Sequence, residues 1–132
     1  MSHLRTVQEI YSAFGRGDVS AILDSLADDV EWEYGASPSN VLWLQPRRGR
    51  SGAEAFFASL QGMRINAFTV KALFESAGVV VALVDVDFTV RSTGRRVTEE
   101  DEVHIWRFDA GGKVSRFRHR VDTLAHERAC ER

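Results

Sequence analysis

The sequence contains a single cysteine, Cys130, among its 132 residues, so no disulfide can form within the chain. A lone cysteine is typical of proteins in a reducing compartment, and we expect a cytoplasmic location. No apolar run approaches the roughly twenty residues of a membrane-spanning helix, and the amino-terminal residues contain no apolar signal core. These absences argue against a membrane partner.

An excess of positive charge is also missing, because 17 basic side chains stand against 19 acidic ones and the formal net charge is −2. Domains that gather phosphate groups are usually basic, so this balance argues against nucleic acid as a partner. The chain contains no internal repeat and no glycine-rich phosphate loop. What is present is an ordinary globular composition, 44% hydrophobic and 27% charged, in a length that fits one domain over residues 1–132.

Hydrophobic spacing predicts three helices in the first half of the chain. Apolar side chains recur at intervals of three and four from Leu4 to Phe14, and a second helix follows Asp18, which stands in an N-cap position. A third helix is expected to begin at Ser51 and end at Gly62, because Ser51 and Glu54 have the spacing of a capping box.

The apolar period changes from helical to alternating after Arg64, which indicates strands. Four long strands are expected, after a shorter one at Val30 to Tyr34, and they are Ile65 to Ser76, Gly78 to Arg91, Arg96 to Phe108 and Lys113 to Val121. Tight connections containing glycine join them, so neighbours should pair antiparallel. The order predicts an α+β fold, in which three N-terminal helices pack on one face of a curved antiparallel or mixed sheet.

One face of this sheet is expected to be apolar and to face the helices. In the strand from Gly78 to Arg91 every second residue is apolar, Phe88 among them. If Gly111 and Gly112 form a two-residue turn, residues at equal distances from it lie opposite each other. This register pairs His104 with His119, Trp106 with Phe117, Glu102 with Val121 and Phe108 with Ser115.

The opposite face of the sheet gathers arginines, which are Arg107, Arg116, Arg118 and Arg120. We expect them to meet Asp85 and Asp87 and to form a charged surface, either solvated or facing a dimer partner, rather than a phosphate site. Val103, Ile105 and Val114 are expected among them, which favours a homodimer through this outer face.

Two histidines on the inner face are the main candidates for proton transfer. His104 lies between Glu102 and Trp106, and an imidazole beside a carboxylate can act as general acid or base near neutral pH. His119 faces it and could hold a substrate oxygen with it. A purely structural role for each histidine stays open. The two histidines with Glu102 would also make a two-histidine, one-carboxylate metal set, but no dense ligand motif supports one and we expect no metal.

Trp32 and Tyr34 share the parity of Val30 and are expected to point inward. There Tyr34 can offer a hydroxyl to a ligand carbonyl, while core packing is the alternative for Trp32. Trp43 lies in the long connection from Gly35 to Arg50 and is expected to be a flap residue over the pocket or a dimer contact.

The acidic run from Glu99 to Glu102 is expected to be a solvated strand end, with Asp101 facing outward. Glu102 is the exception, because it shares the inward parity of His104. The run is therefore interpreted as surface except at its last residue.

Four motifs follow one another along the chain: residues 11–18 (YSAFGRGD), 26–32 (LADDVEW), 48–52 (RGRSG) and 106–114 (WRFDAGGKV). Their order and spacing resemble the SnoaL-like and ketosteroid-isomerase-like branch of the nuclear transport factor two superfamily, over nearly the whole chain. Proteins of this kind are cone-shaped, with helices closing one end of a curved sheet around a deep pocket. The resemblance implies a pocket for a small hydrophobic molecule and a homodimer.

The functional residues of ketosteroid isomerase do not carry over. Its catalytic base corresponds to Tyr34, its oxyanion tyrosine to Ile10 with Tyr11 one residue out of phase, and its protonated aspartate to His104. These differences argue against steroid isomerisation by that mechanism. SnoaL-like polyketide cyclases place an acidic residue at the position of His104, whereas relatives such as scytalone dehydratase work through histidines and tyrosines.

We therefore expect an enzyme of isomerase, cyclase or dehydratase type that transfers protons on a hydrophobic, carbonyl- or hydroxyl-bearing substrate without a cofactor. A non-catalytic ligand-binding or interaction module is the alternative. The expected catalytic residues are His104, His119 and Tyr34. The residues expected to contact the ligand are Glu102, Trp106, Phe117, Trp32, Trp43, Phe88 and Tyr11.

Overall fold

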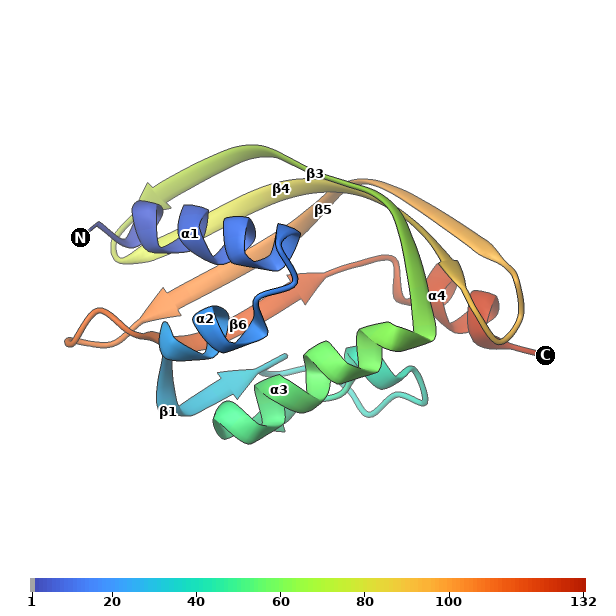
Figure 1. Ribbon diagram of the computed structural model, residues 1–132, viewed down its shortest axis with the longest axis horizontal. Helices are drawn as coiled ribbons and strands as arrows, with labels where there is room; N and C mark the ends of the chain where they lie inside the picture. The colour runs from blue at the N-terminus through green and yellow to red at the C-terminus, as the bar shows by residue number, and fades with distance from the viewer. Residues whose placement is uncertain (1) are drawn as a thin grey trace.

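A curved sheet of six strands is the frame of the protein, whose computed structural model describes residues 2–132 (Figure 1). The strand order is β2-β1-β6-β5-β4-β3. The strands are β1 (Leu26–Trp32), β2 (Arg47–Arg48), β3 (Met63–Ser76), β4 (Val79–Val90), β5 (Arg96–Phe108) and β6 (Val114–Arg120). β1 and β6 pair in parallel and the other neighbours pair antiparallel, so the sheet is mixed, as predicted.

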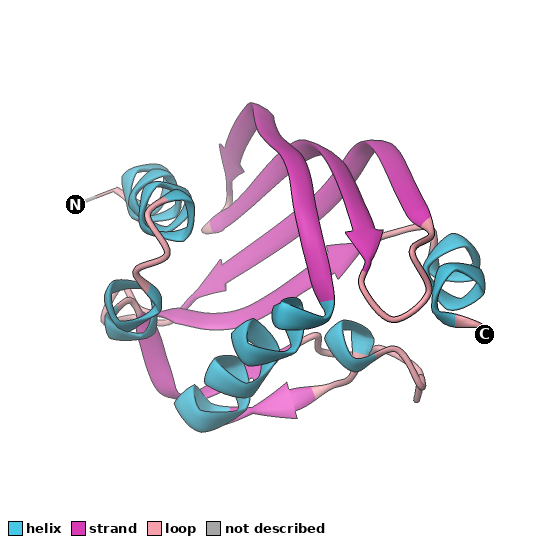
Figure 2. Ribbon diagram, turned by 45° about the vertical axis from the view of Figure 1, so that its right-hand side comes forward, coloured by secondary structure: helices cyan, strands magenta, loops and turns pink. Residues whose placement is uncertain are grey.

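Helices cover the inner face of the sheet. They are α1 (His3–Gly15), α2 (Val19–Asp24), α3 (Gly49–Ser59) and α4 (Thr123–Cys130), with 3-10 turns η1 (Leu42–Leu44) and η2 (Leu60–Gly62). Figure 2 shows the sheet bending round α1, α2 and α3, with α4 at the opposite end beside the C-terminus. This arrangement confirms the predicted α+β class with three N-terminal helices, but α4 was not predicted. No helix within residues 2–132 is long and apolar enough to cross a membrane.

The helix starts follow the predicted capping in one case and not in another. Asp18 caps α2, because its carboxylate accepts a hydrogen bond from the Ala21 amide at 3.1 Å. The capping box at Ser51 is wrong: α3 begins at Gly49, and its N-cap residue Arg48 makes no side-chain capping bond. The strand β2 runs directly into α3, so its pairing with β1 fixes where the helix begins.

The predicted register of β5 and β6 is confirmed where the histidines lie, because His104 pairs with His119 and Trp106 with Phe117. The two-residue turn is wrong. Asp109 accepts hydrogen bonds from the amides of Gly111 and Lys113, at 2.9 and 3.0 Å, and so builds a longer turn.

The longer turn shifts the register by one residue at its base. Phe108 therefore lies opposite Val114, not Ser115, and Val114 is buried in the core rather than on the outer face. The predicted pair of Glu102 with Val121 does not form either, since β6 ends at Arg120.

On the outer face the arginines find other partners than the predicted aspartates. Asp87 forms an ion pair with Arg96, and Asp85 forms one with Lys71 at 3.0 Å. Arg116 pairs instead with Glu31, at 2.6 Å, on the neighbouring strand β1. Asp85 and Asp87 of β4 thus pair with basic residues of β3 and β5. They do not pair with the arginines of β6, which lie on the side of the sheet next to β1.

Candidate functional site

An apolar cavity lies between the sheet and the helices, with a volume of about 80 Å3. We call it the inner cavity. The predicted site residues that line it are Tyr11, Trp43, Phe88, Glu102, His104, Trp106, Phe117 and His119. The structure thus brings eight of the ten predicted residues to one place.

Tyr34 does not face this cavity, and the prediction that it points inward is wrong. Its hydroxyl accepts a hydrogen bond from Arg107 at 3.2 Å, and the guanidinium of Arg116 lies 4.1 Å from the centre of its ring. The reason is that β1 ends at Trp32 and Glu33 adopts a left-handed conformation with φ of 58°, which breaks the strand alternation. Tyr34 therefore lies on the outer face.

The two remaining tryptophan predictions have different outcomes. Trp32 points inward but lies behind the cavity wall, stacked on Phe117 with ring centres 4.2 Å apart, so core packing describes it. Trp43 lines the inner cavity in η1 and is only 4% exposed, which makes it a buried wall residue rather than a dimer contact.

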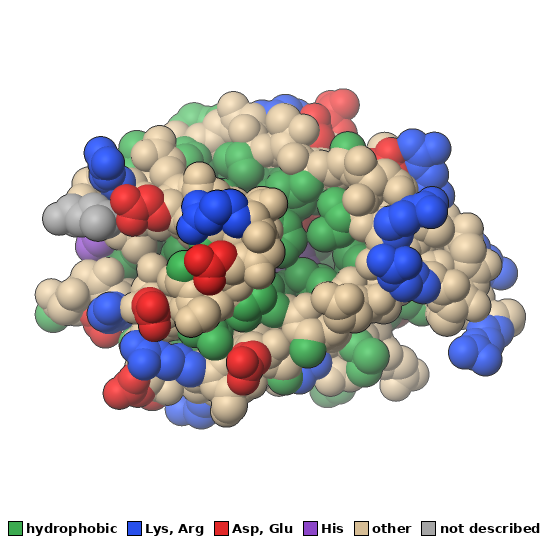
Figure 3. Space-filling view, viewed as in Figure 1, with side chains coloured by type: hydrophobic (Ala, Val, Ile, Leu, Met, Phe, Trp, Pro, Cys, Tyr) green, Lys and Arg blue, Asp and Glu red, His purple; other side chains and the backbone are tan. Residues whose placement is uncertain are grey.

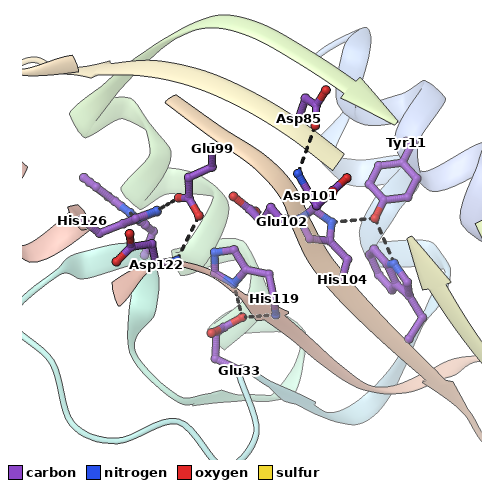
Figure 4. A network of polar contacts seen from close by, with 12 residues as sticks. Tyr11, Glu33, Asp85, Glu99, Asp101, Glu102, His104, His119, Asp122 and His126 are labelled. Atoms are coloured by element: carbon purple, nitrogen blue, oxygen red, sulfur yellow. Dashed lines mark hydrogen bonds and ion pairs between the residues drawn. The ribbon is translucent and has the colours of Figure 1, made fainter. Parts of the chain in front are cut away.

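One chain of hydrogen bonds holds the carboxylate of Glu102 (Figure 4). The indole of Trp106 donates to the Tyr11 oxygen at 3.1 Å, and the Tyr11 oxygen lies 2.6 Å from Nδ1 of His104. Nε2 of His104 lies 2.8 Å from Glu102 Oε1. Because an indole can only donate, the simplest polarity runs from Trp106 through Tyr11 and His104 to Glu102. Both nitrogens of His104 have partners, so a ligand in the cavity can form a hydrogen bond with Glu102 but not with the ring nitrogens of His104.

Burial and hydrogen bonding set the protonation of this chain. Burial lowers the pKa of His104 below its usual value, against the opposing hydrogen bond with Glu102. Burial would raise the pKa of Glu102, but its hydrogen bond with His104 and the charge of His119 bring it below the usual value. Burial raises the pKa of Tyr11 well above its usual value. Near neutral pH the chain therefore contains neutral Tyr11, neutral His104 and ionised Glu102.

A second pair, His119 and Glu33, closes the other side of the cavity. The left-handed turn at Glu33 directs its carboxylate under β6, where Oε1 accepts from the His119 amide at 2.8 Å and from His119 Nδ1. Burial lowers the pKa of His119, but the hydrogen bond and charge of Glu33 raise it above its usual value. Nδ1 is held by Glu33, while the other ring nitrogen does not bond Glu33, and His119 and Glu102 line the same cavity. Strand alternation would have placed Glu33 outside, so nothing in the sequence pattern indicated it.

A third histidine, His126, was missed because α4 was not predicted. Trp43 Nε1 donates to His126 Nδ1 at 3.0 Å, so Nδ1 carries no proton and Nε2 donates its own to Glu99. Glu99 faces inward because a bulge at Asp101, where φ is 61°, shifts the register of β5 against β4. The prediction of a solvated acidic run is thus wrong for Glu99 and confirmed for Asp101, which contacts Lys71 at 2.6 Å.

Three side chains could be considered as metal ligands, since atoms of Glu99, Glu102 and His126 lie within 4.8 Å of one another. A histidine that binds a metal donates its second ring N–H to an acceptor. Here the second nitrogen of His126 faces the donor Trp43, which places the proton on Nε2, where a metal would need the lone pair. His104 has no vacant nitrogen either. The residues do not fit a metal ion.

Comparisons with known proteins agree on the family and the fold. The SnoaL-like domain family matches residues 7–117. Among curated proteins none matches the chain. An NTF2-like protein of unknown function from Burkholderia pseudomallei is 28% identical, with a TM-score of 0.82 and 100% of both chains covered.

Two further solved structures share the fold and were determined with ligands. TerC, co-crystallised with polyporic acid, is 24% identical, with a TM-score of 0.78 and 96% of both chains covered. A Mycobacterium tuberculosis protein in complex with estradiol-17beta-hemisuccinate is 18% identical, with a TM-score of 0.76, 95% of this chain covered and 98% of that chain. At these identities the likeness concerns the fold.

Proposed function

The chain belongs to the SnoaL-like family, and from this premise we propose that it is an enzyme of isomerase, cyclase or dehydratase type. It transfers protons on a small hydrophobic molecule that carries a carbonyl or hydroxyl group, without a cofactor. Two structural neighbours were solved with polyporic acid and with an estradiol derivative, which supports a hydrophobic substrate. We place the protein in the cytoplasm as one SnoaL-like domain over residues 1–132.

The observation that carries the proposal is that Glu102 and His119 line one apolar cavity with opposite protonation preferences. Glu102 has one carboxylate oxygen bonded to His104 and its pKa is lowered, so it is ionised near neutral pH and able to accept a proton. His119 has one nitrogen bonded to Glu33 and its pKa is raised, which suits an acid. An acid and a base whose environments move their pKa values apart are the usual arrangement for proton transfer.

The reaction step follows from these two groups. Glu102 takes a proton from the carbon next to a carbonyl group, and the C–H bonding electrons form the carbon–carbon double bond of an enol. His119 donates its Nε2 proton to the carbonyl oxygen, which accepts the developing charge. When Glu102 returns its proton to another carbon of a conjugated enol and His119 takes back the enol proton, the product is an isomer. When the Glu102 proton goes instead to a hydroxyl on the β-carbon, that hydroxyl leaves as water, His119 again takes back the enol proton, and the product is the dehydrated enone. His104 and Tyr11 line the cavity and position Glu102, and they take no part in the proton transfer.

Hydrogen exchange tests this step without knowledge of the natural substrate. We expect the protein in deuterium oxide to exchange the α-protons of small aryl ketones faster than free imidazole and acetate at the same concentrations. The expected gain comes from holding acid, base and ketone together in an apolar cavity. Proton NMR of the ketone measures the exchange rate directly. A rate equal to that of the free imidazole and acetate, for ketones shown to bind, would contradict the proposal.

A ligand-binding protein without catalysis is the second candidate. It is favoured by the closed hydrogen bonding of His104, whose two nitrogens are occupied by Tyr11 and Glu102, and by the outer position of Tyr34. Tight binding of aryl ketones with no exchange would identify this second function.

A homodimer through the outer face is part of the same proposal. Apolar side chains of β4 and β5, including Leu83, Val103 and Ile105, form a strip on this face beside Phe74, which is 56% exposed. We expect the wild-type protein to sediment as a dimer and Ile105→Glu to sediment as a monomer, because a charge in the strip opposes its burial. Leu124→Glu, at an exposed position of α4, is the matched control and should stay dimeric. A monomeric wild type would exclude this interface.

A further inference from the structure

A second, larger cavity adjoins the inner cavity and opens at the surface. We call it the outer cavity, and its volume is about 590 Å3. The residues that line both cavities are Tyr11, Phe14, Leu60, Met63, Ile65 and Phe68. Figure 3 shows a hollow with hydrophobic side chains on this side of the molecule, beyond the end of α1 and above α3. A ligand can therefore extend from one cavity into the other.

The sizes of the two cavities divide such a ligand into two parts. The inner cavity, about 80 Å3, accepts only a small end group beside Glu102 and His119. The remainder of a larger molecule must lie in the outer cavity, against apolar side chains such as Phe57 and Val70. The outer cavity thus contacts the part of the ligand that does not react.

Only one charged side chain lines the outer cavity among residues 2–132, and it is Arg91 at the end of β4. Its backbone amide donates to the Gly62 carbonyl at 2.9 Å, and its Nε donates to the Gln61 carbonyl at 3.1 Å. These two bonds hold the guanidinium at the junction of η2 and β3. The terminal nitrogens make no ion pair with a carboxylate of the described chain.

Several arginines of the protein, unlike Arg91, are paired with a carboxylate. Arg96 is paired with Asp87, and Arg116 is paired with Glu31. The guanidinium of Arg91 is held by the Gln61 carbonyl, which orients it but does not neutralise it. A fixed, uncompensated guanidinium at the edge of an apolar cavity is suited to bind a carboxylate, because its two terminal nitrogens can donate in parallel.

We propose that the ligand of this site carries a carboxylate at the end remote from the reacting group, and that Arg91 binds it. The molecule is then an aryl or alicyclic acid whose apolar body fills the outer cavity and whose reacting end enters the inner cavity. The inference rests on the proposed function in taking the two cavities as one ligand site. It does not require that the site be catalytic.

Isothermal titration calorimetry with three matched probes tests the proposal. The probes are 6-phenylhexanoate, 6-phenylhexanamide and 6-phenylhexylamine, which share one apolar body and differ in charge. We expect the carboxylate to bind roughly fivefold more tightly than the amide, as a solvent-accessible charged pair allows, and the amine to bind least. The preference should shrink at high salt, since the pair lies at the surface.

Variants assign the preference to one side chain. Arg91→Gln is expected to bind the carboxylate and the amide equally, while its affinity for the amide matches the wild type. Arg64→Gln is the control, since Arg64 is an exposed arginine on β3 that does not line the outer cavity. The inference is overturned if Arg91→Gln still prefers the carboxylate to the amide, or if the wild type binds the amide as tightly as the carboxylate. Neither outcome affects the result of the ketone exchange experiment. Failure of all three probes to bind overturns it as well, and ketone exchange then reports on the proposed function separately.

Discussion

Replacing His119 by alanine is expected to lower the rate of ketone α-proton exchange by a factor of about 10² to 10⁴, the usual contribution of a positioned general acid or base. His119 lines the cavity, and only one of its ring nitrogens is bonded to Glu33. Without the imidazole nothing donates a proton to the substrate oxygen, although Glu102 remains in place. Exchange followed by proton NMR, at a ketone concentration far below saturation, measures the loss.

Two further variants separate chemistry from folding. His119→Gln retains a side-chain amide that can donate to Glu33, so it should fold and still lose exchange. His3→Ala is the matched surface control, because His3 stacks on Phe108 with ring centres 4.1 Å apart and does not line the inner cavity. Wild-type exchange in a correctly folded His119→Gln protein would remove His119 from the mechanism.

The rate of ketone α-proton exchange should depend on pH in the way that the protonation of His119 does. His119 acts as a protonated acid, and the charge and hydrogen bond of Glu33 raise its pKa above the usual value near 6.5. Exchange should therefore persist through neutral pH and fall as the pH rises through this raised pKa. In Glu33→Gln the carboxylate charge that raises the pKa of His119 is removed, so this pKa should fall. The decrease in exchange rate at alkaline pH should therefore move to lower pH.

Replacing Glu33 by alanine is expected to reduce the free energy of unfolding by about 3–5 kcal/mol, as for other buried charged pairs that lose one partner. The side chains of Glu33 and His119 are only 2% and 8% exposed, and the removed carboxylate also accepts the His119 amide. Urea unfolding at pH 6 measures the difference. Glu31→Ala is the matched control, because Glu31 is a neighbouring acid with exposed partners on Arg48 and Arg116, and its loss should cost less than about 1 kcal/mol.

The raised pKa of His119 determines how its contribution to the free energy of unfolding changes with pH. The folded-state pKa of His119 is raised, so the stability that this histidine contributes is fully present below its unfolded value of about 6.5. It is lost as the pH rises through the folded-state pKa. The difference between wild type and Glu33→Ala should therefore narrow toward alkaline pH. A difference that stays constant from pH 6 to pH 9 would contradict the role given to the pair.

The strands and their register could be predicted because alternation along β4, β5 and β6 is strong and the inner residues are apolar. The pairing of His104 with His119 followed from the position of the last turn, even though the turn itself is built by Asp109 in another way. A register error of one residue near the turn did not spread along the strands, since a shift would move every inner side chain to the outer face.

The remaining site residues depend on departures from regular geometry. Glu33 and Asp101 adopt left-handed conformations that no periodic pattern indicates, and they reverse the expected directions of Tyr34 and Glu99. The third histidine lies in α4, a short helix with charged residues and a weak apolar face, which hydrophobic spacing does not reveal. Regular segments were thus predictable, whereas irregular backbone at the site was not.

The burial of the three tryptophans determines the fluorescence expected of the protein. Trp32, Trp43 and Trp106 are each at most 4% exposed, so their emission should lie near the blue end of the indole range. Trp43 and Trp106 line the inner cavity and are hydrogen-bonded to His126 and Tyr11, while Trp32 stacks behind Phe117. Intrinsic fluorescence therefore reports the occupancy of the inner cavity with little background from the solvent-facing surface, and ligand screening needs no label.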